Sequence, residues 1–265
     1  MRRDEAKELK VFREDLKMEE DQTFYLRFGP LDLYIENSHN EIRLRWMTSN
    51  DWMDSSFRHE FPFEGKFPQN LLTEKRFAFS NQRPVIKISP CLGERAFVVK
   101  PDKTFMVLPG ESAKIFMSTP MNLRLHDVLA DRVIDEVPVL NRVKTWFGES
   151  PTDGELCFFT RIHAALIEEN LPFRPHRALT QLIVENSSKR PLPIKQLKIP
   201  VNYLRLFQNE KGVFVTSSLS FRLTDGDQLK DLQILPPSDE KPHPVHEPRE
   251  MIPKMFFKSV TEIMR

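Results

Sequence analysis

LDLYIENSHNEIRLRWM, residues 31–47, is the stretch that decides the fold class. Apolar side chains occupy every second position in residues 31–36 and again in residues 41–47. Between these runs, Asn37-Ser38-His39-Asn40 is a cluster of turn-forming residues. A period of two is typical of a strand with one buried face. We therefore expect a β-hairpin whose second face lies in water.

Short apolar runs of similar character continue to residue 235. Leu108-Pro109-Gly110-Glu111-Ser112 and Gln208-Asn209-Glu210-Lys211-Gly212 separate some of them as predicted turns. Residues 156–167 fit a buried strand or a helix, and we prefer the strand. Strands spaced by about 8–12 residues are typical of a sandwich or barrel. The expected strands are residues 85–88, 96–99, 104–108, 113–118, 121–127, 156–167, 179–185, 194–199, 203–207, 213–223 and 232–235.

The predicted fold is mostly β, with two β-sandwich-like (immunoglobulin-like) domains and short flanking helices at the termini. A chain of 265 residues is long enough for two such domains. We expect a charged leader at 1–20, the first domain at 21–142, the second at 143–235, and a proline-rich linker with a short amphipathic helix at 236–265.

Both ends of the chain have patterns of their own. Leu9, Phe12 and Leu16 have helical spacing, which fits a short amphipathic helix and a frayed, solvated leader equally well. PPSDEKPHPVHEP, residues 236–248, is expected to be an extended linker because it contains five prolines. The segment after it predicts a helix and a candidate docking element, with one apolar face formed by Ile252, Phe256, Val260 and Ile263.

Composition narrows the possible functions. The 39 basic and 38 acidic residues nearly cancel, which argues against nucleic-acid binding through bulk positive charge. Eight glycines are few for 265 residues, and this scarcity disfavours a phosphate-binding loop. The N-terminus has no signal-peptide pattern, and no apolar run reaches the roughly 18 residues of a membrane span. We expect a cytoplasmic protein in which Cys91 and Cys157 are free, buried thiols.

The sequence contains no nucleotide-binding, hydrolase, zinc-protease or calcium-loop motif. His243 and His246 have an HxxH spacing, but prolines surround them in the expected linker, so we predict no metal site there. Cys157 and His163 would lie about 20 Å apart along a strand, too far for a nucleophile and its base. The simpler interpretation is a core cysteine and an unrelated histidine. We accordingly predict no catalytic residues, no cofactor and no metal.

The residues with the most unusual chemistry lie between 145 and 178. Arg174, His176 and Arg177 are in a proline-stiffened stretch, where two arginines suit a phosphate, a carboxylate or an acidic partner. Trp146 and Glu155 bracket the expected domain boundary and suit a ligand groove. For each group the simpler alternative is structural: solvated charges before a strand, or aromatic packing at a domain junction. These five residues are the candidate ligand-binding or partner-binding set.

Several short motifs resemble a prokaryotic family catalogued as domain of unknown function 432. They are Thr145-Trp146-Phe147-Gly148, Gly154-Glu155-Leu156-Cys157, Arg174-Pro175-His176-Arg177-Ala178, Asn186-Ser187-Ser188, Leu108-Pro109-Gly110-Glu111 and Ser118-Thr119-Pro120. The resemblance covers about residues 24–235, and Phe158 stands where the family pattern has tyrosine.

The resemblance implies no known activity and supplies no catalytic residues. Members of the family are often encoded beside small-conductance mechanosensitive channels, which implies an accessory role at the cytoplasmic face of the membrane. The leading hypothesis is therefore a non-enzymatic cytoplasmic protein that binds a protein partner, with a membrane channel as the implied partner. The alternative is a small-ligand-binding or anion-binding module that uses the 145–178 region.

Overall fold

The computed structural model describes residues 9–68, 73–80, 83–148, 152, 154–224, 228–238 and 242–251. This part of the chain is mostly β, as predicted, and contains several sheets and three short 3-10 helices. None of these helices is long and apolar enough to cross a membrane. The immunoglobulin-like arrangement of the two domains stays a prediction.

The chain forms two compact units that are not consecutive in sequence. Unit 1 contains residues 1–91, 120–141 and 173–176, and unit 2 contains residues 92–119, 142–172 and 177–265. The predicted domains instead meet at a single boundary near residue 142. The difference arises because β7 (Ile86–Cys91) pairs with β11 (Asn122–Asp127), although the chain between them belongs to unit 2.

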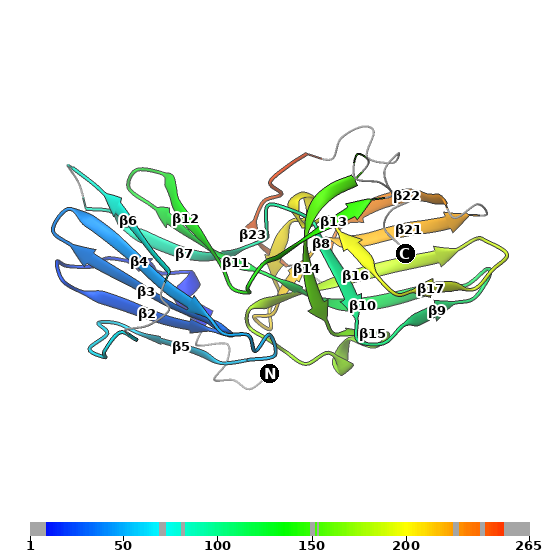
Figure 1. Ribbon diagram of the computed structural model, residues 1–265, viewed down its shortest axis with the longest axis horizontal. Coiled ribbons are helices and arrows are strands. Elements are labelled where there is room, and N and C mark those ends of the chain that lie inside the picture. The colour runs from blue at the N-terminus through cyan, green and yellow to red at the C-terminus, as the bar shows by residue number, and fades with distance from the viewer. Residues whose placement is uncertain are drawn as a thin grey trace. The chain divides into compact units, whose positions relative to one another are not determined.

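Unit 1 consists of two sheets that face each other in Figure 1. One has the order β1-β7-β11-β12 and the other the order β5-β2-β3-β4-β6. Its strands are β1 (Asp15–Leu16), β2 (Thr23–Phe28), β3 (Leu31–Ser38), β4 (Glu41–Thr48), β5 (Phe57–Glu60), β6 (Thr73–Ala78), β7 (Ile86–Cys91), β11 (Asn122–Asp127) and β12 (Arg132–Pro138), with the 3-10 helix η1 at Leu9–Phe12.

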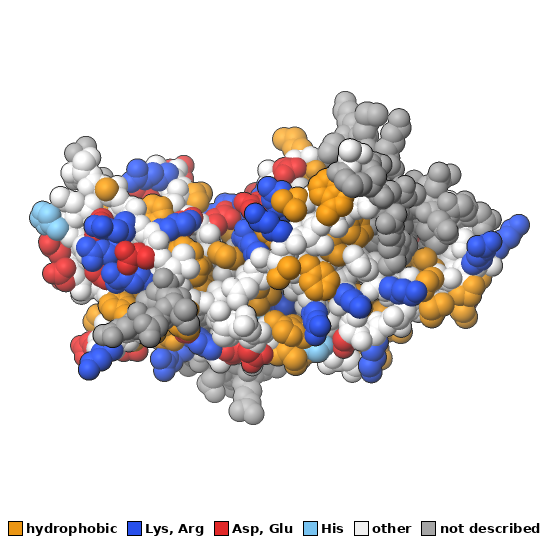
Figure 2. Space-filling model, viewed as in Figure 1, with side chains coloured by type: hydrophobic (Ala, Val, Ile, Leu, Met, Phe, Trp, Pro, Cys, Tyr) orange, Lys and Arg blue, Asp and Glu red, His pale blue; other side chains and the backbone are white. Residues whose placement is uncertain are grey.

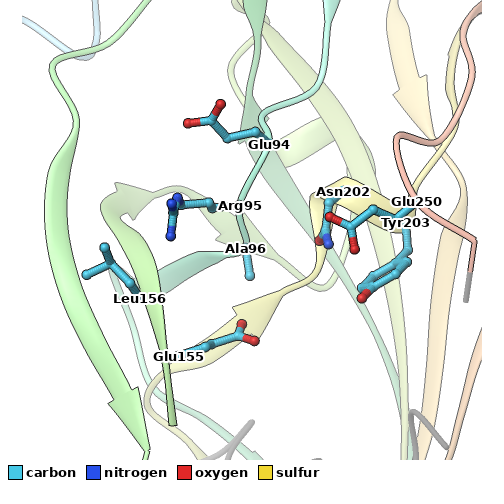
Figure 3. A pocket seen from close by; sticks show the side chains of 8 residues that line it. All are labelled: Glu94, Arg95, Ala96, Glu155, Leu156, Asn202, Tyr203 and Glu250. Carbon is cyan, nitrogen blue, oxygen red and sulfur yellow. The ribbon is translucent and has the colours of Figure 1, made fainter. Parts of the chain in front are cut away.

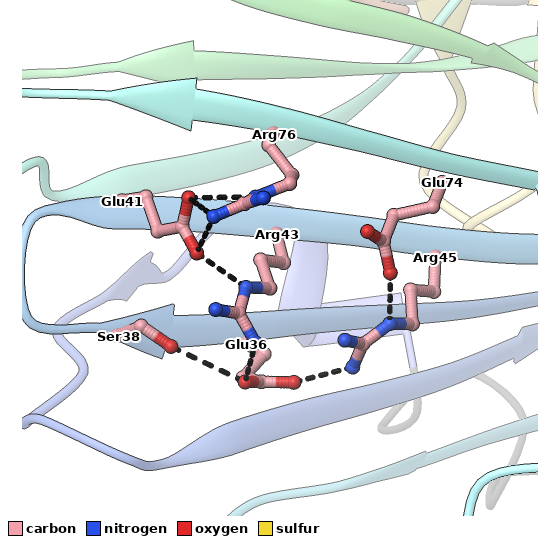
Figure 4. Close-up of polar contacts among 7 residues, drawn as sticks. All are labelled: Glu36, Ser38, Glu41, Arg43, Arg45, Glu74 and Arg76. Carbon is pink, nitrogen blue, oxygen red and sulfur yellow. Dashed lines mark hydrogen bonds and ion pairs between the residues drawn. The ribbon is translucent and has the colours of Figure 1, made fainter.

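The predicted hairpin is confirmed as β3 and β4, but its second face lies in water only in part, because Asp32 and Tyr34 are buried. Leu33 pairs with Trp46 and Ile35 pairs with Leu44, and these side chains are buried. On the other face, arginine and glutamate side chains alternate across three strands (Figure 4). Exposed ion pairs contribute little stability one by one, so burial of the apolar row determines the register. The charged face contains Glu36, Glu41, Arg43, Arg45, Glu74 and Arg76, with Ser38 beside Glu36.

The N-terminal segment belongs to unit 1 from Leu9 onward. Leu9 and Phe12 are buried in η1, and the Phe12 ring lies 5.3 Å from that of Phe28. The predicted spacing therefore does mark a buried face, but the helix is a single 3-10 turn. Leu16 continues in β1, which pairs with β7, so residues 9–16 are not a solvated leader.

Unit 2 contains a large sheet with the path β15-β10-β16-β20-β19-β23, a four-stranded sheet β13-β14-β8-β18 and the two-stranded ribbon β17-β9 (Figure 1). Its elements are β8 (Phe97–Pro101), β9 (Phe105–Val107), β10 (Ser112–Pro120), β13 (Val143–Gly148), β14 (Gly154–Ile162), β15 (Ala164–Ala165), β16 (Arg177–Asn186), β17 (Leu192–Ile194), β18 (Leu197–Ile199), β19 (Leu206–Gln208), β20 (Phe214–Thr216), β21 (Ser218–Thr224), β22 (Gln228–Leu235), β23 (His243–His246), η2 (Glu168–Asn170) and η3 (Val201–Tyr203).

The structure of unit 2 decides between the alternatives for residues 156–167 and corrects the prediction for the proline-rich segment. The stretch that fitted a strand or a helix is a strand, β14, followed by the short β15. The proline-rich segment is more than a linker, because residues 243–246 form β23 and pair with β19. The predicted C-terminal amphipathic helix, residues 252–263, lies outside the described residues.

Candidate functional site

A polar pocket of about 520 Å³ in unit 2 is the candidate site (Figure 3). Four segments far apart in the sequence form it: the approach to β8, the start of β14, η3, and the chain that follows β23. The lining residues are Glu94, Arg95, Ala96, Glu155, Leu156, Asn202, Tyr203 and Glu250.

Strand alternation positions Glu155. In the β13–β14 hairpin Glu155 pairs with Phe147, and Cys157 points to the same face two residues later. Phe147 and Cys157 are buried in a small core with Ala96 and Val98. Glu155 therefore lies on the same face of β14 as Cys157, at the end of the strand where this small core borders the pocket.

Glu155 has two polar partners. Lys198 Nζ, on β18, lies 3.0 Å from Glu155 Oε1, and the Cys157 thiol donates to the same oxygen at 3.4 Å. Lys198 is buried and its ammonium lies 5.9 Å from the centre of the Phe147 ring. A buried ammonium requires such a partner, so Glu155 also holds the structure together at this point.

The opposite wall consists of Asn202, Tyr203 and Glu250. The backbone N–H groups of Arg249 and Glu250 donate to Asn202 O at 2.9 and 3.2 Å, which fixes the last described segment to η3. Burial and a hydrogen bond to the Glu250 carboxylate raise the pKa of Tyr203. Tyr203 is thus a hydrogen-bond donor at neutral pH.

One acceptor in this wall is unsatisfied within the described part of the chain. Asn202 Oδ1 is buried, and no described group donates to it. In Figure 3 the side chains of Asn202, Tyr203 and Glu250 face Glu155 across the pocket. The third carboxylate, Glu94, pairs with Arg142 at 3.3 Å. The lining therefore carries three carboxylates and one guanidinium, that of Arg95, so acceptors predominate among its charged groups. This lining suits a ligand group that carries N–H donors.

Trp146 is on β13, directly opposite the lining residue Leu156, and 47% of its surface is exposed. By strand alternation its side chain lies on the other face of the hairpin from Phe147 and Glu155. The indole packs over Gly154, where an added Cβ would lie 2.9 Å from Trp146 Nε1 and 2.6 Å from Phe147 O. Glycine at 154 thus allows the close approach that sets the indole's position.

The three residues of the 174–177 stretch have structural partners. Arg177, in unit 2, is buried and donates to Ser118 O at 2.9 Å and to Arg161 O at 3.4 Å. Backbone carbonyls occupy its guanidinium, whereas the sequence analysis assigned it to a ligand or partner.

Arg174 and His176 belong to unit 1. Arg174 is buried; its Nε donates to Met53 O at 3.1 Å, and its guanidinium lies 5.6 Å from the centre of the Trp52 ring. Burial lowers the pKa of Arg174. His176 is fully buried against Gly29, where an added Cβ would meet Nδ1 at 2.2 Å. A joint site of all five predicted residues stays a prediction. Of the five, Glu155 lines the pocket, and Trp146 lies opposite the lining residue Leu156.

No pattern in the sequence pointed to Asn202, Tyr203 or Glu250 as site residues. These residues reach the pocket because β18 pairs with β8 and β23 pairs with β19, contacts between distant segments. Among the described residues, no group of three or more histidine, cysteine, aspartate or glutamate side chains is placed to hold a metal ion.

Comparison with known proteins identifies a family and nothing else. The model of a family described as "Protein of unknown function (DUF432)" matches residues 14–265. The match is longer than the resemblance at residues 24–235 and includes the proline-rich segment and the last residues. No curated protein and no solved structure matches the chain.

Proposed function

We propose that this chain, which belongs to the DUF432 family, is a non-enzymatic protein that binds a protein partner at the β13 edge of unit 2. The observation that carries the proposal is the half-exposed Trp146 on the edge strand β13, directly opposite Leu156, which lines the polar pocket. Large aromatic side chains next to a pocket are frequent anchors of protein interfaces.

The strand that carries Trp146 is suited to this role. β13 is the edge of the β13-β14-β8-β18 sheet in the described part of the chain. An edge strand offers backbone N–H and C=O groups to an incoming strand. Val143 on the same strand is also exposed. We infer that the partner adds a segment along β13 and packs one side chain against Trp146. The next side chain of such a strand points to the opposite face, where a basic residue would be directed toward Glu155 and Glu250.

The partner's basic side chain follows from the lining of the pocket. Glu155, Glu250 and Glu94 are acceptors in the lining, and Arg95 is its one positively charged residue. A guanidinium or ammonium group supplies several N–H donors at once. Lys198 already neutralises part of the Glu155 charge, so hydrogen bonding is expected to contribute more than net attraction.

A non-enzymatic role is supported by the partners of the reactive side chains. The Cys157 thiol faces the core and donates to Glu155, and His163 Nδ1 lies 3.3 Å from Asp102 Oδ2. The two residues therefore have separate partners instead of forming a nucleophile–base pair. The raised pKa keeps Tyr203 protonated, which disfavours it as a general base at neutral pH.

A small-ligand-binding module is the second candidate. The volume of the pocket favours it. The lining has three carboxylates and one guanidinium, that of Arg95, which disfavours an anion, so the ligand would be an amine or a guanidine. Direct titration of the purified chain with arginine or a polyamine distinguishes this candidate from a partner that binds along β13.

A small-conductance mechanosensitive channel is the first partner to test, because of the family association described above. We propose an assay in which the tagged full chain is co-expressed with such a channel from the same genome and recovered from solubilised membranes. Trp146→Ala is expected to lower channel recovery about tenfold or more, as for an anchor residue. Val133→Ala, at an exposed position on the edge strand β12 of unit 1, is the matched control.

The outcomes separate the parts of the proposal. Equal recovery with Trp146→Ala and the unmodified chain would contradict docking at β13. No recovery of the channel by the unmodified chain would contradict the choice of partner. A chain that ends at residue 251 tests the C-terminal segment alone, because Arg249 and Glu250 keep their bonds to Leu92 O and Asn202 O.

A further inference from the structure

Two turns that are distant in the sequence meet at one end of unit 2. The first joins β9 to β10 at residues 108–111, and the second joins β16 to β17 at residues 187–191. Asn186 connects them: its Nδ2 donates to Val107 O at 2.9 Å and to Arg190 O at 2.8 Å, and its carbonyl accepts from Gly110 N at 2.7 Å. Asn186 is fully buried, so the two turns form one rigid structure.

The ribbon beside these turns exposes apolar side chains. β9 and β17 pair in the register Val107 with Leu192 and Met106 with Pro193. Val107 and Leu192 are buried, as expected for the inner face. Met106 is nevertheless 56% exposed and Leu108 58% exposed, and Pro193 is exposed as well. The outer face of a two-stranded ribbon normally carries polar side chains, and here it is apolar.

Basic side chains border this apolar face. Lys189 and Arg190 are exposed in the second turn, which Asn186 holds against the first. Glu111 is the acidic residue of the first turn. Orange and blue side chains adjoin at this end of unit 2 in Figure 2. We call the structure formed by Met106, Leu108, Pro109, Lys189, Arg190 and Pro193 the β9–β17 tip.

We propose that the β9–β17 tip docks on the surface of an anionic lipid bilayer. Leu108 and Met106 enter the boundary between headgroups and acyl chains, and Lys189 and Arg190 contact the lipid phosphates. Apolar side chains with flanking cations are complementary to that boundary, which is apolar on one side and negatively charged on the other. The tip consists of two turns and a ribbon, which suits a planar surface better than a small soluble anion.

The backbone of the tip supports this role. Gly110 has φ +76, which glycine adopts without strain, and a Cβ there would meet nothing within 4 Å. The turn therefore depends on backbone conformation and on Asn186, and the exposed Leu108 side chain is not required for its packing. Substitutions at Leu108, Lys189 and Arg190 should leave the fold intact. The proposal is independent of docking at β13.

Sedimentation of the full chain with lipid vesicles tests the proposal. We expect binding to phosphatidylcholine vesicles that contain phosphatidylserine, weaker binding at high salt, and little binding to phosphatidylcholine alone. Leu108→Asp should lower the partition coefficient about tenfold or more, and each charge reversal in Lys189→Glu and Arg190→Glu at least about fivefold. Circular dichroism of each variant verifies that it is folded.

Matched variants make the result specific. Leu129→Asp changes a leucine that is 53% exposed in a turn of unit 1, and Lys211→Glu reverses an exposed charge in another turn of unit 2. Neither should change vesicle binding. Failure of the unmodified chain to bind anionic vesicles, or equal binding by folded Leu108→Asp, would overturn the proposal. Displacement from vesicles by inorganic phosphate at constant ionic strength would indicate a soluble anion as the ligand and would also overturn it.

Discussion

Replacing Asn186 with aspartate tests whether this side chain holds the β9–β17 tip together. Its Nδ2 donates to Val107 O and Arg190 O, and its Oδ1 accepts from the N–H and the hydroxyl of Ser188 at 3.0 and 2.7 Å. Aspartate has nearly the same shape, but it places a second carboxylate oxygen against two carbonyl oxygens. The substitution therefore removes two donated hydrogen bonds and introduces repulsion at the same positions.

The expected cost follows from these two contacts. Loss of a donor to a buried acceptor such as Val107 O costs about 1–3 kcal/mol, and Arg190 O can regain a bond from water, so its loss costs less. We expect Asn186→Asp to lower the free energy of unfolding of unit 2 by about 2–4 kcal/mol at pH 7. Burial will raise the pKa of the new carboxyl, and the stability lost to its charge returns as the pH falls below that pKa.

Urea denaturation at pH 4 and pH 7, read by pulsed hydrogen exchange of peptides from unit 2, measures this cost separately from unit 1. Asn186→Ala removes the same donor without adding charge, so its deficit relative to the unmodified chain should not depend on pH. Asn170→Asp, at an exposed position of unit 2, controls for the added charge. An unchanged midpoint for Asn186→Asp, or an equal deficit at both pH values, would refute the reasoning.

Two further predictions concern other contacts. Gly154→Ala should destabilise unit 2 by about 1–3 kcal/mol in the same assay, because the new Cβ would lie 2.6 Å from Phe147 O; an unchanged midpoint would contradict this. In unit 1, burial and a 2.7 Å hydrogen bond to Asp32 raise the pKa of Tyr25 to about 12. The hydrogen bond from Tyr25 therefore contributes to the free energy of unfolding below about pH 10, and this contribution is lost as the pH rises toward 12. Tyr25→Phe should abolish this alkaline loss of stability in urea titrations. A profile identical to that of the unmodified chain would count against the hydrogen bond.

Clean alternation predicted the β3–β4 hairpin, but it did not reveal the interior strand β2, whose residues are nearly all buried, or some of the edge strands. On β4, buried and partly exposed residues alternate, so the period of two is visible in the sequence. On β3 the second face was expected to lie in water, but Asp32 and Tyr34 are buried there and Phe63 and Phe67 pack against Tyr34. β12 and β13 are edge strands with both faces partly exposed, and neither was predicted. The discontinuous units were also hidden, because the pairing of β7 with β11 joins segments with other strands between them.

The candidate site was partly predictable for the same physical reason. Trp146 and Glu155 lie on one hairpin, so their separation of nine residues in the sequence was enough to predict that they are close in space. Tyr203 and Glu250 join them only through tertiary pairing. Unusual local chemistry was a poor guide to a site at Arg177, because a buried guanidinium can be satisfied by backbone carbonyls as well as by a ligand.

The β9–β17 tip shows how a sequence motif can be structural while its neighbours are functional. Leu108-Pro109-Gly110-Glu111 and Asn186-Ser187-Ser188 carry the family resemblance, and the hydrogen bond from Gly110 N to Asn186 O joins them. The buried Asn186 holds both turns in place through its hydrogen bonds. Such rigidity is expected where the exposed side chains of the turns must keep fixed positions to bind another surface. A leucine displayed in water contributes almost nothing to folding and promotes association. The rigid backbone and the exposed Leu108 together therefore favour a docking surface over a simple connection between strands.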